Sequence, residues 1–159
     1  MSSPEGSFVV SDLRERPEFT EAVADRVWRA WWQGKGYPLD YIEGRVAESL
    51  DGAAVPFAVV AHEDSQFLGT ASVIPSDLDE RPEYSPWVAA VWVDPEHRRR
   101  GIGAALVRKA TQGAFESGAD LVYLCALPEK RAFYERLGWQ RLKENVRRNG
   151  LTVLTLARS

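Results

Sequence analysis

The residues best suited to chemistry form a short basic stretch that is rich in glycine. Three consecutive arginines, 98–100, are followed by Gly101 and Gly103, and glycine lets a ligand approach the backbone closely. An apolar run over 87–93 precedes them and a helical pattern over 101–117 follows, which indicates strand, loop and helix. No Ser, Thr, Asp or Asn caps this helix, so its first N–H groups are free. With the helix dipole and the arginines, these donors predict a site for a phosphate-bearing ligand.

The elements around this stretch must position it. After the helix, residues 121–126 form a second continuous apolar strand. A strand, a helical crossover and a strand make a βαβ unit, so we expect strands 87–93 and 121–126 to be parallel neighbours. The other predicted elements are a strand at 8–10, helices at 17–34 and 38–50, a hairpin over 55–74, a short helix at 128–137, and strands at 139–146 and 151–156 that Asn149-Gly150 joins as a hairpin.

Two further segments have both a structural and a functional interpretation. Trp28, Trp31 and Trp32 cluster in the first helix, which we interpret as a face packed on a sheet rather than as an aromatic binding wall. The loop at 76–86 carries four acidic residues and leads into the central strand. It is either solvated charge or a cation-facing wall beside the site, and the sequence leaves both open. The four acidic residues are Asp77, Asp79, Glu80 and Glu83.

Composition and net charge limit which ligands the chain can bind and which class of protein it belongs to. The chain has 159 residues, which fits a single domain over 1–159, and its net charge is −3 with a pI of about 5.5. A local basic patch on an acidic protein favours a small anionic ligand over nucleic acid or an anionic membrane. No apolar run is long enough to span a bilayer. The single cysteine, Cys125, suits the cytoplasm, and the separation of His62 and His97 in the sequence argues against a metal site.

The glycine spacing differs from that of nucleotide-binding motifs. In the dinucleotide fingerprint G-x-G-x-x-G, the third glycine would fall where this chain has Leu106. Asp120 precedes the next strand instead of ending it, and a G-x-x-x-x-G-K-S/T phosphate loop is absent. A dinucleotide-binding oxidoreductase is therefore disfavoured, and it would require binding of a nicotinamide cofactor.

Two motifs, in order, resemble those of the GNAT acyltransferase superfamily. Arg98-x-x-Gly101-x-Gly103 is similar to its acetyl-CoA motif Q/R-x-x-G-x-G/A, and residues 133–139, Phe-Tyr-Glu-Arg-Leu-Gly-Trp, resemble its FYekLGF segment. The resemblance is strong from about residue 55 to the end and weak over residues 1–50. It implies an α/β GNAT-like fold, with a mixed, mostly antiparallel sheet, a parallel, splayed central strand pair and flanking helices.

The resemblance also implies where acetyl-CoA binds. The CoA pyrophosphate would be held by the backbone amides of residues 99–104, with charge added by the arginines. The pantetheine arm would lie between the splayed strands, pairing with the backbone of one strand while Leu124-Cys125-Ala126 forms the other wall. The expected cofactor-binding residues are Val91, Trp92, Val93, Arg98, Arg99, Arg100, Gly101, Ile102, Gly103 and Ala104.

Tyr134 matches the usual general acid of this family. A phenol there would give a proton to the CoA thiolate as the thioester bond breaks. The chain lacks two residues that many members have, an Asn shortly before this tyrosine and a Glu base on the central strand. The base therefore stays open among the four acidic loop residues and His62. Cys125 is interpreted as a small buried residue rather than as an acetylated nucleophile.

Together these residues predict an acetyl-CoA-dependent N-acetyltransferase that transfers acetyl directly to a primary amine in a ternary complex. The acidic loop favours a small, cationic acceptor, with Asp77, Asp79, Glu80 and Glu83 as its candidate binding residues. Two alternatives stay open, namely a non-catalytic module that senses acyl-CoA and a protein or peptide N-acetyltransferase. Because many relatives dimerise, a homodimer is one assembly that the resemblance allows.

Overall fold

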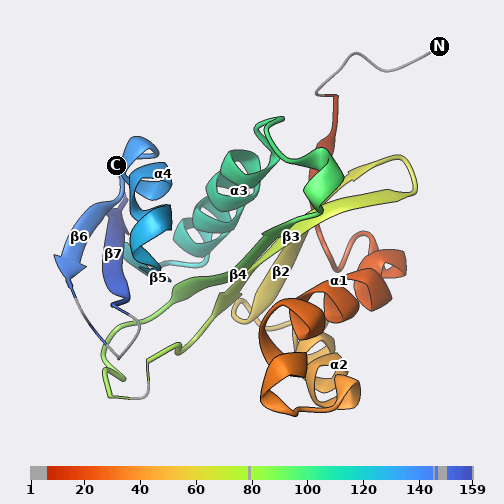
Figure 1. Cartoon of the computed structure of the whole chain (residues 1–159), viewed down its shortest axis with the longest axis horizontal. Helices are drawn as coiled ribbons and strands as arrows, with labels where there is room; N and C mark the ends of the chain where they lie inside the picture. Colours follow the sequence, from red (N-terminus) through yellow and green to blue (C-terminus); the bar gives the residue numbers. More distant parts are fainter. Residues whose placement is uncertain (1–6, 79, 145, 147–149, 159) are drawn as a thin grey trace.

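Seven strands form one sheet in the order β1-β2-β3-β4-β5-β7-β6 (Figure 1). The computed structural model describes residues 7–78, 80–144, 146 and 150–158. The strands are β1 (Val9–Asp12), β2 (Phe57–Glu63), β3 (Gln66–Ile74), β4 (Trp87–Val93), β5 (Leu121–Ala126), β6 (Gln140–Lys143) and β7 (Thr152–Ala157). The α-helices are α1 (Thr20–Val27), α2 (Leu39–Glu48), α3 (Ile102–Glu116) and α4 (Arg131–Arg136). Neighbouring strands are antiparallel except β4 and β5, so the expected mixed, mostly antiparallel α/β architecture is confirmed.

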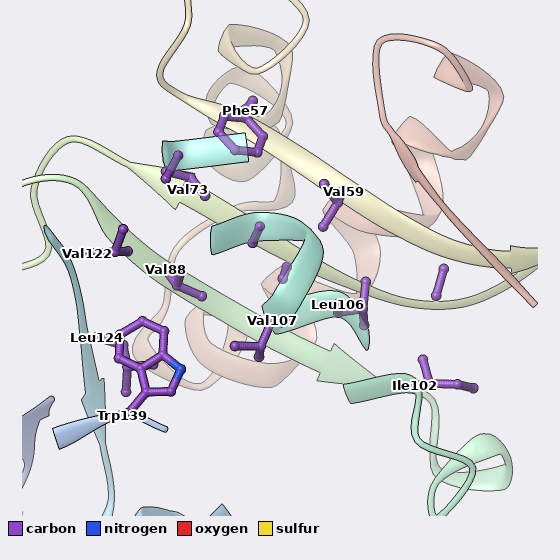
Figure 2. Packing of buried hydrophobic residues seen from close by; sticks show 14 of the residues in the cluster. Phe57, Val59, Val73, Val88, Ile102, Leu106, Val107, Val122, Leu124 and Trp139 are labelled. Carbon is purple, nitrogen blue, oxygen red and sulfur yellow. The ribbon is translucent and has the colours of Figure 1, made fainter. Parts of the chain in front are cut away.

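Helices lie on both faces of the sheet. α3 packs across the middle strands on one face, here called the α3 face, and builds the main apolar core with them (Figure 2). α1 and α2 cover the opposite face, here called the α1 face, over β2 and β3 (Figure 1). Because side chains of β4 pack on both faces of the sheet, its sequence is one continuous apolar run instead of an alternating pattern. Val88, Val91 and Val93 contact the α3 face, and Ala90 and Trp92 contact the α1 face.

The parallel strands β4 and β5 meet at a single pair of residues. Trp87 lies opposite Tyr123, and no later register pair joins these two fully described strands, although β4 continues to Val93. β5 is instead held along its other edge by β7 over its whole length. The predicted parallel neighbours and their splay are therefore confirmed. The space between the strands widens toward the residues that lead into α3.

The predicted first helix is present but not uniform. A 3-10 turn at Pro17–Phe19 leads into α1, and a π-helical turn at Trp28–Trp32 follows it. A second 3-10 turn, Gln33–Lys35, ends at Gly36, whose φ of +85° stops the helix. π-Helical turns inside helices are frequent at functional sites.

The tryptophans of this turn divide between packing and exposure. Trp28 and Trp32 pack against the core of the α1 face, which confirms their interpretation as a packed helix face. Trp31 is 39% exposed, and its ring meets that of Trp92 edge-on at 6.4 Å. The helix therefore also offers one exposed aromatic side chain above the central strand.

The C-terminal hairpin is shorter than its apolar pattern predicts. β6 covers only four exposed residues, Gln140–Lys143, where the sequence predicts a strand over 139–146. Trp139, which precedes β6, is buried in the main core and anchors the strand there. β6 pairs antiparallel with β7, so the hairpin itself is confirmed. Asn149 of the predicted tight turn lies outside the described residues.

Candidate active site

The loop between β4 and α3 is shaped by two left-handed residues. Arg99 has a φ of +66° and Gly101 a φ of +79°. Gly101 occupies the N-cap position of α3 without any side-chain cap, and the first helical hydrogen bond runs from the Ala105 amide to the Gly101 carbonyl oxygen at 3.1 Å. The amides of the first helical turn therefore lack a helical acceptor, as the sequence predicts. Successive unpaired amides at a helix start form a concave site for an anion.

The three arginines of this loop have different surroundings. Arg98 Nε donates to the Val93 carbonyl oxygen at 2.9 Å, and its guanidinium lies 5.0 Å from the ring centre of Trp92. Arg100 is paired with a carboxylate of the β2–β3 hairpin. Arg99 is exposed and has no side-chain partner among the residues described. Only one of the three predicted charges therefore lacks a protein partner.

The β4 edge that faces β5 is open beyond Trp87. On its other edge β4 pairs with β3, where a register shift gives β4 one residue more than β3 near Ala90. Ala90 has a φ of +55°, a left-handed conformation that is rare for alanine and typical of a bulge. Val91, Trp92 and Val93 follow the bulge and have no strand partner on the β5 side, among residues that are all described. The Val93 carbonyl oxygen already accepts from Arg98 Nε, and the unpaired groups left on this edge can pair with an extended amide-containing chain.

Tyr134 lies on α4, beside the start of α3. Its ring packs edge-on against Phe133 at 5.0 Å and against Trp139 at 6.3 Å. The Phe133 ring in turn reaches Gly103, since a Cβ built on this glycine would lie 3.5 Å from Phe133 Cζ. The two sequence motifs are therefore adjacent in space. Burial raises the pKa of the Tyr134 phenol to about 12, so the hydroxyl holds its proton at neutral pH.

The acidic loop, residues 76–86, packs on β5 and β7 on the α1 face of the sheet. Leu78 is 1% exposed and anchors the loop in a small cluster on the α1 face, and Tyr84 stacks on Tyr123 at 4.7 Å. The pKa of Tyr123 is raised by burial and by the nearby Tyr84 and Glu83. Glu83 is therefore close to the residue at which β4 and β5 separate.

The other acidic candidates have different positions. Asp77 and Glu80 are exposed and have interaction partners, and Asp79 lies outside the described residues. His62 is buried at the end of β2, where it stacks on Phe19 and its Nε2 lies 3.0 Å from Ser11 Oγ. β3 separates it from β4, so it does not face the open edge.

Two separate clusters pack on the α1 face. One joins α1 and α2 to β2, and the other joins the acidic loop to β5 and β7. Between Trp92, at the first cluster, and Trp87, in the second, β4 carries the small half-buried residues Ala89 and Ala90. These alanines lie where β4 and β5 begin to diverge. Cys125 belongs to the second cluster, half-buried among apolar side chains, in agreement with its interpretation as a packing residue.

A network that sequence reasoning missed joins α1 to the end of β4. Arg26 Nε donates to Asp94 Oδ1 at 2.9 Å, and Trp92 Nε1 donates to the same oxygen at 2.8 Å. The hydrogen bond to Asp94 raises the pKa of Arg26. A cavity of about 360 Å³ lies beside these three side chains. An Asp directly after an apolar strand was the only local signal, because its partner is 68 residues away.

Asp94→Asn is expected to lower the free energy of unfolding by about 1–3 kcal/mol, because it removes the charge that pairs with half-buried Arg26. Thermal or urea unfolding measures this loss. Asp120→Asn is the matched control, since the Asp120 side chain is 92% exposed and its ion pair with Arg158 is long at 3.4 Å. Equal losses in the two variants would contradict the importance of the network.

Comparison with known proteins gives this arrangement its family. Residues 56–141 match the family described as "Acetyltransferase (GNAT) domain". The chain belongs to the GNAT acetyltransferase family. The match includes β2 to β5, the glycine loop, α3 and the segment around Tyr134. Acetyltransferase activity follows from membership of this family, and the resemblance seen in the two motifs is confirmed.

Solved GNAT structures share the fold over nearly the whole chain. A protein from Desulfovibrio desulfuricans assigned to the GNAT acetyltransferase family has a TM-score of 0.70 at 21% identity, over 95% of this chain and 99% of its own. An aminoglycoside 6'-N-acetyltransferase complexed with coenzyme A has a TM-score of 0.70 at 17% identity, over 94% and 96%. A Salmonella typhimurium protein described as an acetyltransferase with its cofactor acetyl-CoA has a TM-score of 0.67 at 18% identity, over 95% and 92%.

In the described part of the chain, no group of three or more His, Cys, Asp or Glu side chains could hold a metal ion. Within the same part, no helix has the length and apolarity needed to cross a membrane.

Proposed function

We propose that this GNAT protein is an acetyl-CoA-dependent N-acetyltransferase that transfers acetyl directly to a primary amine of a small, cationic molecule within a ternary complex. One observation carries the proposal. The open edge of β4 leads from the point where β4 and β5 part to the uncapped start of α3, where Phe133 packs near Gly103, and Tyr134 follows Phe133 in the same core. A chain with a phosphate at one end and a thioester at the other fits such an arrangement.

The donor side would use backbone groups more than side chains. The amides of residues 99–104 would hold the pyrophosphate, with Arg99 as the arginine whose charge is not already paired. The edge of Val91, Trp92 and Val93 would pair with the amides of the pantetheine arm, as an added strand would. This direction brings the thioester toward Ala90 and the closed end of the β4–β5 opening.

The transfer step would need one proton donor and one proton acceptor. The amine nitrogen forms the new bond to the thioester carbon, the C–S bond breaks with its electron pair on sulfur, and Tyr134 protonates that sulfur. The nitrogen then gives up one N–H proton to the proton acceptor, and Tyr134 regains a proton from solvent. Burial keeps the proton on Tyr134 but also makes the phenol a weaker acid. The same apolar surroundings make the departing thiolate more basic than in water, which favours the transfer.

The acceptor would approach over the α1 face. The strip formed by Ala89 and Ala90 lies at the edge of the cluster of α1 and α2, against which Ala90 packs, and opposite the face that holds Tyr134. Glu83 is the acidic loop residue that interacts electrostatically with Tyr123, which lies opposite Trp87, and it would attract an ammonium group and accept its proton. We retain Asp77, Asp79 and Glu80 as weaker candidates for the same role, with Asp79 outside the described residues.

A screen of amines read by CoA release tests the proposal. Purified protein with acetyl-CoA is expected to release CoA with at least one small di- or polyamine, amino sugar or amino-acid derivative, and mass spectrometry should find the acetylated amine. Peptides with free N-termini or lysines belong in the same panel. Turnover with peptides alone would show that the acceptor is a peptide and not a small molecule. Since β4 carries no ionisable residue, the screen also tests a sensor, which would bind acetyl-CoA and release no CoA with any amine.

A further inference from the structure

Arg100 is turned away from the anion-binding side of its own loop. Its Nη2 pairs with Glu63 Oε1, on the last residue of β2, and its Nη1 lies 3.1 Å from His97 Nδ1. The side chains of Arg100 and Glu63 are 20% and 28% exposed. Arg100 Nε is buried and has no hydrogen-bond partner among the described residues. The guanidinium is therefore half-buried and held against the β2–β3 hairpin.

His97 extends this contact to the other side of the hairpin turn. Its Nε2 lies 3.3 Å from the side-chain Nε2 of Gln66, the first residue of β3. An arginine can only donate, so His97 Nδ1 accepts from Arg100 and the ring proton is on Nε2. Gln66 Nε2 is the atom that faces this proton, so the Gln66 amide must be turned over for its oxygen to accept it. Glu63 and Gln66 thus hold Arg100 and His97 from the two ends of one turn.

We propose that Glu63, Gln66, His97 and Arg100 form a brace that positions the pyrophosphate loop, and that Arg100 is a positioning residue and not a phosphate ligand. The inference rests on the proposed binding of acetyl-CoA. The loop needs such support because Arg99 has a left-handed φ, which is unfavourable for a residue with a side chain unless its surroundings impose it. The brace holds the residue immediately after Arg99. It thereby keeps the free amides of the α3 start aimed at one point.

The alternative is that Arg100 swings out to bind phosphate when CoA arrives. The two roles predict opposite results for Glu63→Ala. If Arg100 binds phosphate, this variant frees the arginine and removes a negative charge near an anion, so CoA should bind more tightly. If Arg100 is part of a brace, CoA should bind about tenfold more weakly, because the amides lose their fixed arrangement.

Calorimetric titration with coenzyme A distinguishes these roles. The brace predicts weaker binding in Glu63→Ala and in Arg100→Met, and a double variant no weaker than either, since both changes break one contact. It also predicts that Arg100→Lys binds as poorly as Arg100→Met, because lysine keeps the charge but not the planar fork. Tighter binding in Glu63→Ala, or normal binding in Arg100→Lys, would overturn the brace. Glu116→Ala, at the far end of α3, is the control.

A second measurement needs no ligand and separates this inference from the proposed function. Backbone order parameters from NMR should fall at residues 99–101 in free Glu63→Ala and stay at the parent value in Glu116→Ala. Circular dichroism checks that both variants are folded. If the parent protein binds no CoA, the proposed function fails while the order parameters still test the brace. Unchanged order parameters in Glu63→Ala would overturn the brace by themselves.

Discussion

Replacing Tyr134 with phenylalanine is expected to lower kcat for acetyl transfer by about 10²- to 10⁴-fold. The substitution removes only the hydroxyl, and the ring can keep its contacts with Phe133 and Trp139. CoA affinity should therefore be unchanged, and the loss should fall on kcat. Steady-state kinetics with the acceptor found in the amine screen measures this effect. Near-normal turnover with intact CoA binding would remove Tyr134 from the mechanism.

The same residue predicts the shape of the pH profile. Because burial raises the pKa of Tyr134 to about 12, the phenol stays protonated in the folded enzyme through pH 10. The rate should therefore not decline between pH 8 and pH 10 through loss of this proton. A proton donor with an ordinary tyrosine pKa, about 10, would already be half ionised at the upper limit. The wild-type profile serves as the reference for Tyr134→Phe.

Gly69→Ala is expected to lower the free energy of unfolding by about 2–4 kcal/mol. A Cβ at this position in β3 would lie 2.5 Å from the Trp92 carbonyl oxygen and 3.2 Å from Val93 Cα. These are backbone atoms of the central strand, so relief requires β3 and β4 to move apart. Chemical denaturation gives the free energy directly, and the same shift should weaken CoA binding because it displaces the open edge of β4.

Gly44→Ala is the matched control for this prediction. Gly44 lies in the interior of α2, and a Cβ added there would have no neighbouring atom within 4 Å. Alanine there should leave the protein as stable or raise its stability by up to about 1 kcal/mol, since it restricts the unfolded chain. Equal destabilisation in both variants would show that contact with Trp92 is not the cause.

Local patterns predicted the uncapped start of α3 and the parallel pair of β4 and β5, because the features of each are consecutive in the chain. The free helix start follows from the absence of a capping side chain before Ile102, and the parallel strand pair follows from one helical crossover. The left-handed φ of Ala90 has no such signal, because alanine is an ordinary strand residue in an apolar run. Only the register between β3 and β4 reveals the bulge there.

Polar partners that are far apart in the sequence could not be predicted, because no local pattern shows which distant residues meet. The sequence shows three adjacent arginines of equal promise, but it cannot show that Glu63 faces Arg100 from 37 residues away. The sequence also could not distinguish Glu83 from the other acidic residues of its loop. The burial of Leu78 and the stacking of Tyr84 on Tyr123 bring Glu83 near the β4–β5 junction. In both segments, tertiary contacts give different surroundings to residues of the same type.

The single pair between Trp87 and Tyr123 has a mechanical consequence. The sheet is two ribbons, β1 to β4 and β5 to β7, each stiffened by its own antiparallel ladder and joined at one rung. Beyond that rung no register pair of the described residues joins the ribbons, and they are held together by side chains packed under α3. An extended molecule bonded to the free edge of β4 would span the gap beyond the rung. The substrate would then act for the duration of the reaction as a structural element of the sheet.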